Sequence, residues 1–349
     1  MSINIKILGV KDGDANIISL TKDNKSLVIL IDSGEKSFKN KVISELDKTL
    51  TPLKKKAPDL IICTHFDSDH IGGMVDIVNK YKNNIGYVWL HKPNEAMQKT
   101  FALAEDYFNR KIKLIPSIEA AKFKSEMQDI NLLEQAETVL RSIPQLKSLV
   151  ETIENFGIKI EEPFAGKTSL IDWPEIEVIG PTKKYFEKLF PHGIKDSKNI
   201  IREEVEFNLL CETKSYSQSS KSPCEILDEN PDDKKLTATN KASIIFNITL
   251  NNKKYLFSGD AGIESFENIP NYKTELKDLF FLKIPHHASR NNISSELISI
   301  MKPKYASVSG EKYYDQEVEG CLQNKGTQVK IACDNDVELS VNNQFIAFQ

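Results

Sequence analysis

Long hydrophobic runs are absent from this chain of 349 residues. No apolar stretch approaches the ~18 residues that a membrane-spanning helix requires. The first residues also lack the charged start and the apolar core of a signal peptide. These absences predict a cytoplasmic protein that does not enter a membrane. Hydrophobic residues make up 40% of the chain, which is enough for a sizeable core.

Cysteine is scarce, and its five positions contain no Cys-x-x-Cys pair. The sequence places them at Cys63, Cys211, Cys224, Cys321 and Cys333. An odd, scattered set predicts free thiols in a reducing compartment. Cys63 ends a short apolar run, which favours a core position over a role as a metal ligand.

An excess of either charge is also missing. Lysine and arginine number 46 and aspartate and glutamate 50, so the formal net charge is -4. This balance excludes a global basic field that would recruit nucleic acid or an anionic membrane. Two lysine-rich runs, at 54–56 and 110–113, remain local candidates for phosphate contact, although such runs are usually solvated surface.

Potential metal ligands are concentrated in one window, between an apolar run at 59–63 and a segment of helical spacing from 71. This window holds His65, Asp67, Asp69 and His70. Residues two apart in an extended segment point the same way, so His65 and Asp67 are expected to address one ion. Asp69 and His70, on the turn, are expected to reach a second. The alternative is a solvated loop in which Asp69 caps the helix.

Carboxylates end two further predicted strands. Asp32 follows the strand expected at 27–31, where a turn residue or helix cap is the equal alternative. Asp260 follows the strand expected at 253–257. Both strand ends therefore repeat the arrangement of a strand followed by a polar ligand.

Histidines end two other predicted strands. His286 and His287 follow the strand expected at 279–284, and we expect one of the two to be a ligand. They cannot both bind one ion if they continue the strand, because successive side chains then point to opposite faces. His91, after the strand expected at 86–90, is a weaker candidate, since a lone histidine is more often structural.

Hydrophobic periodicity predicts three opening strands, at 3–9, 16–20 and 27–31, that form an antiparallel meander. Strands then alternate with helices, which indicates an α/β layered fold. Further strands are expected at 59–63, 86–90, 157–160, 175–179, 242–250, 253–257, 279–284, 305–309, 328–332, 337–341 and 344–347, and helices at 38–50, 71–82 and 317–324.

Two segments are expected within this single domain of residues 1–349. Residues 94–156 lack glycine and carry apolar side chains at helical spacing, which predicts a helical insertion broken near Pro116 and Pro144. This insertion either packs on the scaffold or forms a lid or a surface for a protein partner or a second copy. Residues 192–240 are rich in polar and charged side chains, which predicts a long mobile loop.

Four motifs together resemble the metallo-β-lactamase fold hydrolases. They are Asp32-x-Gly, His65-x-Asp-x-Asp-His-x-Gly-Gly, Ser258-Gly-Asp260 and Pro-His286-His-x-Ser. Residues 8–15 and 240–246 also resemble the hydrolase domain of the bacterial competence DNA-uptake channel and its soluble relatives. The resemblance implies an αββα sandwich of the α/β (α+β) class.

The resemblance also implies the ligand set. His65 and Asp67 would bind the first ion, and Asp69, His70 and His286 the second. Asp260 would bridge the two ions, and Asp32 would support the shell. His287 would lie beside the open coordination position, so Asp69 and His287 are the expected catalytic residues.

Two departures from the family pattern concern the first ion. Asp67 stands where most members have a histidine, and Asn240 stands at about the place of another missing histidine, with His91 the second choice. Carboxylate is a harder ligand than imidazole, so the two divalent ions are expected to be zinc with manganese tolerated.

The expected activity is hydrolysis of a phosphodiester by a metal-bound hydroxide, as in a nuclease or phosphodiesterase. Nucleic acid or a nucleotide would then be the substrate. One alternative is a metallo-hydrolase of an ester, thioester or lactam. Another is a non-catalytic interaction module that uses the helices of 94–156.

Overall fold

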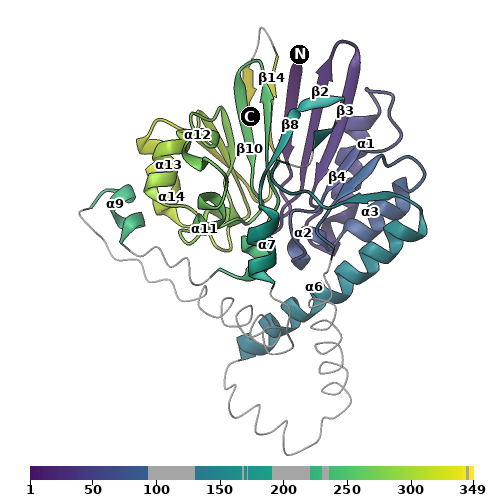
Figure 1. Ribbon diagram of the computed structural model, residues 1–349, viewed down its shortest axis with the longest axis horizontal. Coiled ribbons are helices and arrows are strands. Elements are labelled where there is room, and N and C mark those ends of the chain that lie inside the picture. The colour runs from purple at the N-terminus through teal and green to yellow at the C-terminus, as the bar shows by residue number, and fades with distance from the viewer. Residues whose placement is uncertain (93–129, 167–168, 171, 191–220, 230–235, 343–345) are drawn as a thin grey trace, which may run out of the picture.

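The structure is a computed structural model that describes residues 1–92, 130–166, 169–170, 172–190, 221–229, 236–342 and 346–349. Two β-sheets lie face to face, and helices cover the outer face of each (Figure 1). This αββα sandwich is the fold class that the sequence predicted.

The first sheet has eight strands in the order β15-β14-β1-β2-β3-β4-β5-β6. Their bounds are β1 (Ser2–Ile7), β2 (Asn16–Lys22), β3 (Lys25–Ile31), β4 (Leu60–Ile62), β5 (Tyr87–Trp89), β6 (Lys159–Glu161), β14 (Val337–Val341) and β15 (Ile346–Phe348). Strands β1 to β3 form the predicted antiparallel meander, and β3 to β6 pair in parallel. The carboxyl ends of β3, β4 and β5 therefore meet at one edge of the sheet.

The second sheet has seven strands in the order β13-β12-β11-β10-β9-β8-β7. Their bounds are β7 (Ser169–Leu170), β8 (Trp173–Gly180), β9 (Ile245–Leu250), β10 (Lys253–Phe257), β11 (Phe281–Lys283), β12 (Tyr305–Ser309) and β13 (Gln328–Ala332). The predicted hairpin turn joins β9 to β10 through Asn251 and Asn252, both with positive φ. Strands β10 to β13 run parallel, so their carboxyl ends also share one edge.

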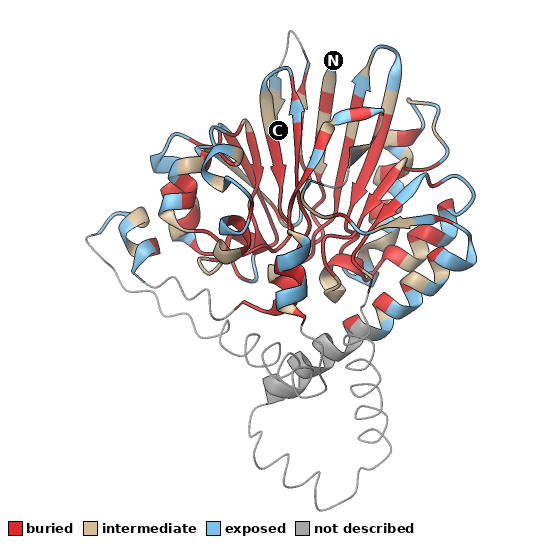
Figure 2. Ribbon diagram, in the orientation of Figure 1, coloured by how far each residue is buried: buried red, intermediate tan, exposed pale blue. Residues whose placement is uncertain are grey.

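Both faces of the central strands are buried (Figure 2). In β3, Leu27, Ile29 and Ile31 face the other sheet, while Val28 and Leu30 face the helices. This division follows from the period of two in a strand. A continuous apolar run is therefore what a strand in this position requires.

Helices α1 (Lys39–Leu50), α3 (Met74–Tyr81) and α6 (Ile130–Asn155) lie outside the first sheet, and α11 (Ile263–Glu267), α12 (Tyr272–Glu275), α13 (Ser295–Met301) and α14 (Gln316–Asn324) outside the second (Figure 1). Shorter elements are η1 (Lys36–Phe38), α2 (Ser68–Ile71), α7 (Lys183–Leu189), α9 (Pro223–Asp228), α10 (Ala238–Lys241) and η3 (His286–Ala288). Helix α1 shows the common pattern, since it buries Val42, Leu46 and Leu50 at intervals of four.

Helix α6 continues through Pro144, so the break predicted there is wrong. A proline inside a helix costs about 3 kcal/mol, because it removes a hydrogen bond and crowds the preceding turn. Burial of Leu146, Leu149 and Ile153 in the core beside the first sheet offsets this cost. The rest of the expected insertion, residues 94–129 with Pro116, lies outside the described residues.

The expected polar loop of 192–240 contains α9 and α10. Ser222 caps α9 through a reciprocal pair of hydrogen bonds with Glu225. The other parts of this range, 192–220 and 230–235, lie outside the described residues. The mobility of this loop therefore stays a prediction.

Cys224 and Cys321 form a disulfide, so the prediction of free thiols is wrong for this pair. They belong to α9 and α14, and the packing of these helices brings their Cα atoms to 4.7 Å. A separation of 97 residues gives no local sign of the pairing. Cys63 is a free, buried cysteine at the end of β4, in the core position that the sequence favoured. Within the described residues, no helix is long and apolar enough to cross a membrane.

Candidate metal centre

The predicted ligands come together where the carboxyl ends of the parallel strands of both sheets meet. Asp32 follows β3, the ligand loop follows β4, Asp260 follows β10, and the paired histidines follow β11. Backbone hydrogen bonds join these loops, among them one from Ser33 N–H to His70 O at 2.7 Å. The topology therefore gathers residues that lie more than 200 positions apart.

The ligand loop enters α2 without using a carboxylate as a cap. Asp67 occupies the N-cap position, but its side chain makes no capping hydrogen bond. Asp69 lies inside the first turn, so the alternative in which Asp69 caps the helix is wrong. The Oδ2 atom of Asp67 is 3.5 Å from Nε2 of His65. Both carboxylates are therefore left for the cluster.

Asp260 lies at the centre of the histidines. Its Oδ2 atom is 3.7 Å from Nε2 of His65, 3.4 Å from Nε2 of His70 and 3.7 Å from Nε2 of His286. These histidines come from both halves of the predicted site. Asp260 is thus placed where a bridging carboxylate would have to lie.

The partners of Nδ1 determine the tautomers of the first two histidines. Asp32 accepts a hydrogen bond from Nδ1 of His70 at 2.9 Å. The Thr64 hydroxyl donates to Asp32 at 2.6 Å, so its oxygen accepts from Nδ1 of His65 at 3.1 Å. In both rings the proton therefore lies on Nδ1, and Nε2 keeps the lone pair that a metal requires.

His286 and His287 do not continue the strand. Their φ values are +44° and +52°, so the condition under which their side chains would point to opposite faces is not met. Nδ1 of His286 donates to Asn292 Oδ1 at 2.9 Å, and Nδ1 of His287 donates to Ser309 O at 2.5 Å. Nε2 of His287 lies 3.8 Å from Oδ2 of Asp69. Both rings therefore present Nε2 to the cluster.

Charges inside this buried cluster shift its pKa values. Burial lowers the pKa of His70, but the negative charges of Asp260, Asp32 and Asp69 together outweigh it and hold that pKa well above the usual range. Burial raises the pKa of Asp260, but His70, His286 and His65 together outweigh it and hold that pKa well below its usual range. For Asp69, burial is opposed by His70 and His287, which bring the pKa down to about 2. Binding of a cation here would release protons from the imidazoles.

The donor set fits divalent cations. Among the described residues, four buried atoms of the cluster have no hydrogen-bond partner, namely Nε2 of His65, His70 and His287 and Oδ1 of Asp260. Ligand atoms of His65, His70 and Asp260 lie within 4.8 Å of one another, as do those of Asp69, His70 and His287. Imidazole and carboxylate are the ligands that zinc and similar ions take.

His91 lies outside this cluster. Its Nε2 atom donates to Pro163 O at 2.7 Å, and its ring stacks on Phe164 and lies against Phe186. Burial lowers the pKa of His91 to about 4. The structure therefore places this candidate as a neutral, hydrogen-bonded core histidine.

Asn240 is buried in α10, and its Oδ1 atom has no hydrogen-bond partner among the described residues. The contacts between this segment and the cluster run through Ser243. The Ser243 hydroxyl oxygen lies 3.3 Å from Nδ1 of His65 and accepts the backbone N–H of Asp260 at 3.1 Å. The role of Asn240 as a ligand stays a prediction, and Ser243 is the residue of this segment whose side chain contacts the cluster.

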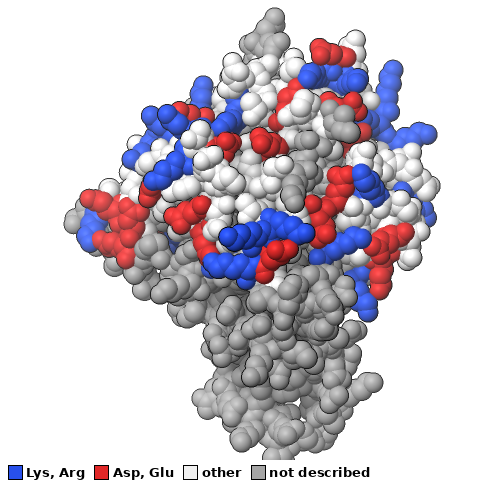
Figure 3. Space-filling model, viewed as in Figure 1, with Lys and Arg blue, Asp and Glu red and all other residues white. Residues whose placement is uncertain are grey.

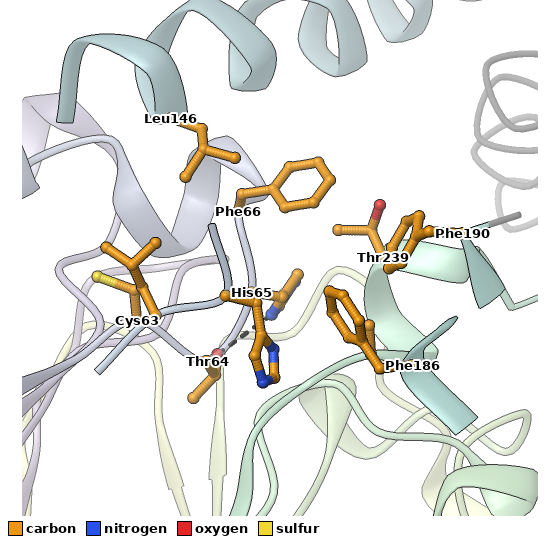
Figure 4. Close-up of a pocket in the computed structure, with 11 residues that line it drawn as sticks. Cys63, Thr64, His65, Phe66, Leu146, Phe186, Phe190 and Thr239 are labelled. Carbon is orange, nitrogen blue, oxygen red and sulfur yellow. Dashed lines mark hydrogen bonds between the residues drawn. The ribbon is translucent and has the colours of Figure 1, made fainter. Parts of the chain in front are cut away.

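An apolar cavity lies beside the cluster (Figure 4). Its walls include Phe66, Leu146, Phe186 and Phe190, with His65 on the side of the cluster. The cavity is small, about 20 Å³, so its apolar lining and not its volume characterises it.

Sequence reasoning missed the side chains that hold the ligands in place, which are Asp14, Thr64, Ser243, Lys283, Asn292 and Ser309. Small polar residues are too common to stand out in a sequence. Lys283 was visible, because a charged residue interrupts the apolar strand expected at 279–284.

Two sheets between helical layers, with a histidine and aspartate cluster at the strand ends, are the arrangement of the metallo-β-lactamase fold. A family model of the metallo-beta-lactamase superfamily matches residues 11–141. The matched part includes Asp32 and the ligand loop and ends before Asp260. The narrower resemblance to the competence DNA-uptake hydrolases stays a prediction.

The solved structures that match this chain have low sequence identity to it. They include hydrolase AbOPH in the beta lactamase superfamily (15% identity, 71% of this chain and 56% of that chain, TM-score 0.32). A diphosphatase from the PhnP family matches with 10% identity over 99% of this chain and 100% of that chain, at a TM-score of 0.41. The dizinc quorum-quenching lactonase AidC matches with 14% identity over 96% of this chain and 79% of that chain, at 0.34.

The chain thus spans about half the length of the first of these structures, at 56%. No protein of curated function matches the sequence significantly. None of these similarities assigns a substrate.

Proposed function

We propose that the protein is a metal-dependent hydrolase with a dinuclear centre that cleaves phosphodiester bonds. One observation carries the metal-dependent part. Nε2 atoms of three histidines and Oδ1 of Asp260 converge, buried and without partners among the described residues. Such atoms cost about 1–3 kcal/mol each when left unpaired, and a cation would satisfy them.

The residues divide into two groups around Asp260. His65 and Asp67 would hold one cation, and Asp69, His70 and His286 would hold the other. Bound divalent cations would lower the pKa of a water toward ~7 and stabilise negative charge that develops on the substrate. Asp32 keeps the His70 proton on Nδ1, so that Nε2 stays available.

Carboxylate-rich ligation supports a phosphodiester substrate. Asp67 supplies a hard oxygen ligand where an imidazole is common in the superfamily, which suits Zn²⁺ and tolerates Mn²⁺. On the face shown in Figure 3, basic and acidic side chains are interspersed among the described residues. The described residues of that face offer a long polyanion no continuous basic track, so we favour a compact phosphodiester such as a nucleotide.

The apolar cavity beside His65 favours a second candidate, hydrolysis of an ester, thioester or lactam with an apolar acyl group.

A cytoplasmic location remains part of the proposal. So does a role of 94–156 in binding a protein partner or a second copy.

The test combines elemental analysis with a substrate panel. We expect about two divalent ions per chain and faster turnover of bis-aryl phosphodiesters than of matched aryl esters and lactones, with Asp260→Asn inactive in both. A faster reaction with esters would support the second candidate. A wild-type protein that binds no Zn²⁺ or Mn²⁺ would refute a metallohydrolase altogether.

The paired histidines of η3 receive separate roles in this proposal. His286 lies against the bridging Asp260 and is assigned to the second cation, whereas His287 lies against Asp69 and would pass a proton to the leaving oxygen. His286→Ala should therefore lose metal, and His287→Ala should keep metal and lose rate. The reverse order would exchange the two roles.

A further inference from the structure

A buried ion pair lies behind the metal centre. Nζ of Lys283 donates to Oδ2 of Asp14 at 2.9 Å and to Ile284 O at 3.1 Å, and both charged side chains are 2% exposed. Lys283 is the one lysine or arginine in the described part of the chain that is buried. Burying such a pair costs several kcal/mol per ion before their attraction is counted, so stability alone is a weak reason for its presence.

Asp14 connects this pair to the ligands. One of its carboxylate oxygens lies within 4.8 Å of ligand atoms of Asp32 and His70. Its backbone N–H donates to Asp69 O at 3.1 Å. The Ser309 hydroxyl donates to Oδ1 of Asp14, and the Ser309 carbonyl accepts the hydrogen bond from Nδ1 of His287. A change of charge at Asp14 or Lys283 therefore changes the electrostatic potential at the ligand atoms.

The charged side chains of the cluster and of the Lys283–Asp14 pair add up to a small whole number. The carboxylates are Asp14, Asp32, Asp67, Asp69 and Asp260. Their five negative charges and the single positive charge of Lys283 leave four negative charges. Two divalent cations neutralise that number.

We propose that Lys283 is the internal counter-charge of the metal centre, and that it and Asp14 are positioning residues that set the charge of the site to the one that two divalent cations neutralise. This inference rests on the proposed function, because it presumes a dinuclear centre. It assigns neither residue to contact with the substrate.

Three variants separate charge from stability. Asp14→Asn keeps an acceptor for Ser309 and leaves the site one negative charge short. Lys283→Met keeps the hydrocarbon stem and removes the positive charge. The double variant restores the balance. Each metal-stripped protein is titrated with Mn²⁺ by calorimetry, and its melting temperature is measured without metal.

We expect Asp14→Asn to lose about 10- to 100-fold in affinity for the second Mn²⁺, a range typical of groups around the ligands. Lys283→Met should lose none, and the double variant should lie within about threefold of the wild type. Both single variants should melt at lower temperature, because each leaves a buried charge unpaired.

Equal losses of affinity in the two single variants, or affinities that follow the melting temperatures, would refute the inference and leave a purely structural pair. In either case two Mn²⁺ ions bound to the wild type would leave the proposed function standing. A wild type that binds none would refute the proposed function first.

Discussion

The pH dependence of the free energy of unfolding tests whether His91 is a buried core histidine or a metal ligand. The ring is buried as the neutral form, and its Nε2–H donates to Pro163 O. Its pKa falls from an ordinary 6.5 to about 4, because burial penalises the charged form. The perturbation we choose is His91→Gln, which keeps an N–H donor and removes the titration.

The sign follows from proton uptake. Below pH 6.5 His91 is protonated in the unfolded chain, whereas in the folded protein it stays neutral down to about pH 4. The stabilisation is therefore complete above pH 6.5 and is lost as the pH falls toward 4. At 1.36 kcal/mol per pKa unit, this histidine accounts for a loss of about 3 kcal/mol over that window.

The assay is urea unfolding of metal-stripped wild type and His91→Gln at several pH values from 4 to 8. The variant starts lower at pH 8, since it loses ring stacking on Phe164. The gap should then close by about 3 kcal/mol on acidification. The other histidines titrate in both proteins and cancel in the difference.

Parallel curves would refute the assignment of His91 as a buried neutral core residue. The metal content of His91→Gln provides a second check, and we expect it to equal that of the wild type. If His91→Gln bound one ion fewer than the wild type, His91 would be a metal ligand, as the sequence allowed.

Three further predictions concern the site and the fold. Asp260→Asn should lower bound metal from about two ions to fewer than one by elemental analysis, with an unchanged circular dichroism spectrum, because a neutral amide bridges cations poorly. Gly259→Ala should lower the melting temperature more than Gly157→Ala. Both glycines have positive φ, but a Cβ at position 259 would lie 2.7 Å from Cβ of Thr64, whereas a Cβ at position 157 would face open space. Thiol titration in denaturant should find two more thiols after reduction than before, and Cys224→Ser should abolish the difference. Unchanged metal, equal melting temperatures or an equal thiol count would contradict these predictions in turn.

The local part of the site was predictable from residues close together in the chain. The apolar run before His65 and the helical spacing after His70 placed the ligands between a strand and a helix. The structure has His65 and Asp67 there, but Asp69 and His70 lie in the short helix α2, and the expected helix 71–82 is represented by the end of α2 and by α3. The antiparallel meander and the Asn251-Asn252 hairpin were equally local, because turn chemistry and periodicity act over a few residues.

Distant contacts decided what each predicted residue does. Cys224 and Cys321 form a disulfide because the packing of α9 on α14 brings them together. Pro144 lies inside α6 because the helix packs against the first sheet. Neither contact is visible in a local sequence pattern. The positive φ values of His286 and His287 put both rings toward the cluster, against the alternation of a strand.

The residues that hold the ligands also depend on tertiary structure. Thr64 and Asp32 set which ring nitrogen keeps its lone pair, and they are 32 residues apart. Lys283 lies 269 residues from Asp14, yet the two form one buried pair behind the ligands. The sequence by itself determined the candidate ligands and the layers of the fold, since both depend on short-range pattern. Only the packing of the two sheets decided the hydrogen-bond partners of the histidine rings, the Lys283–Asp14 pair and the surroundings of His91, because these depend on which atoms meet across the fold.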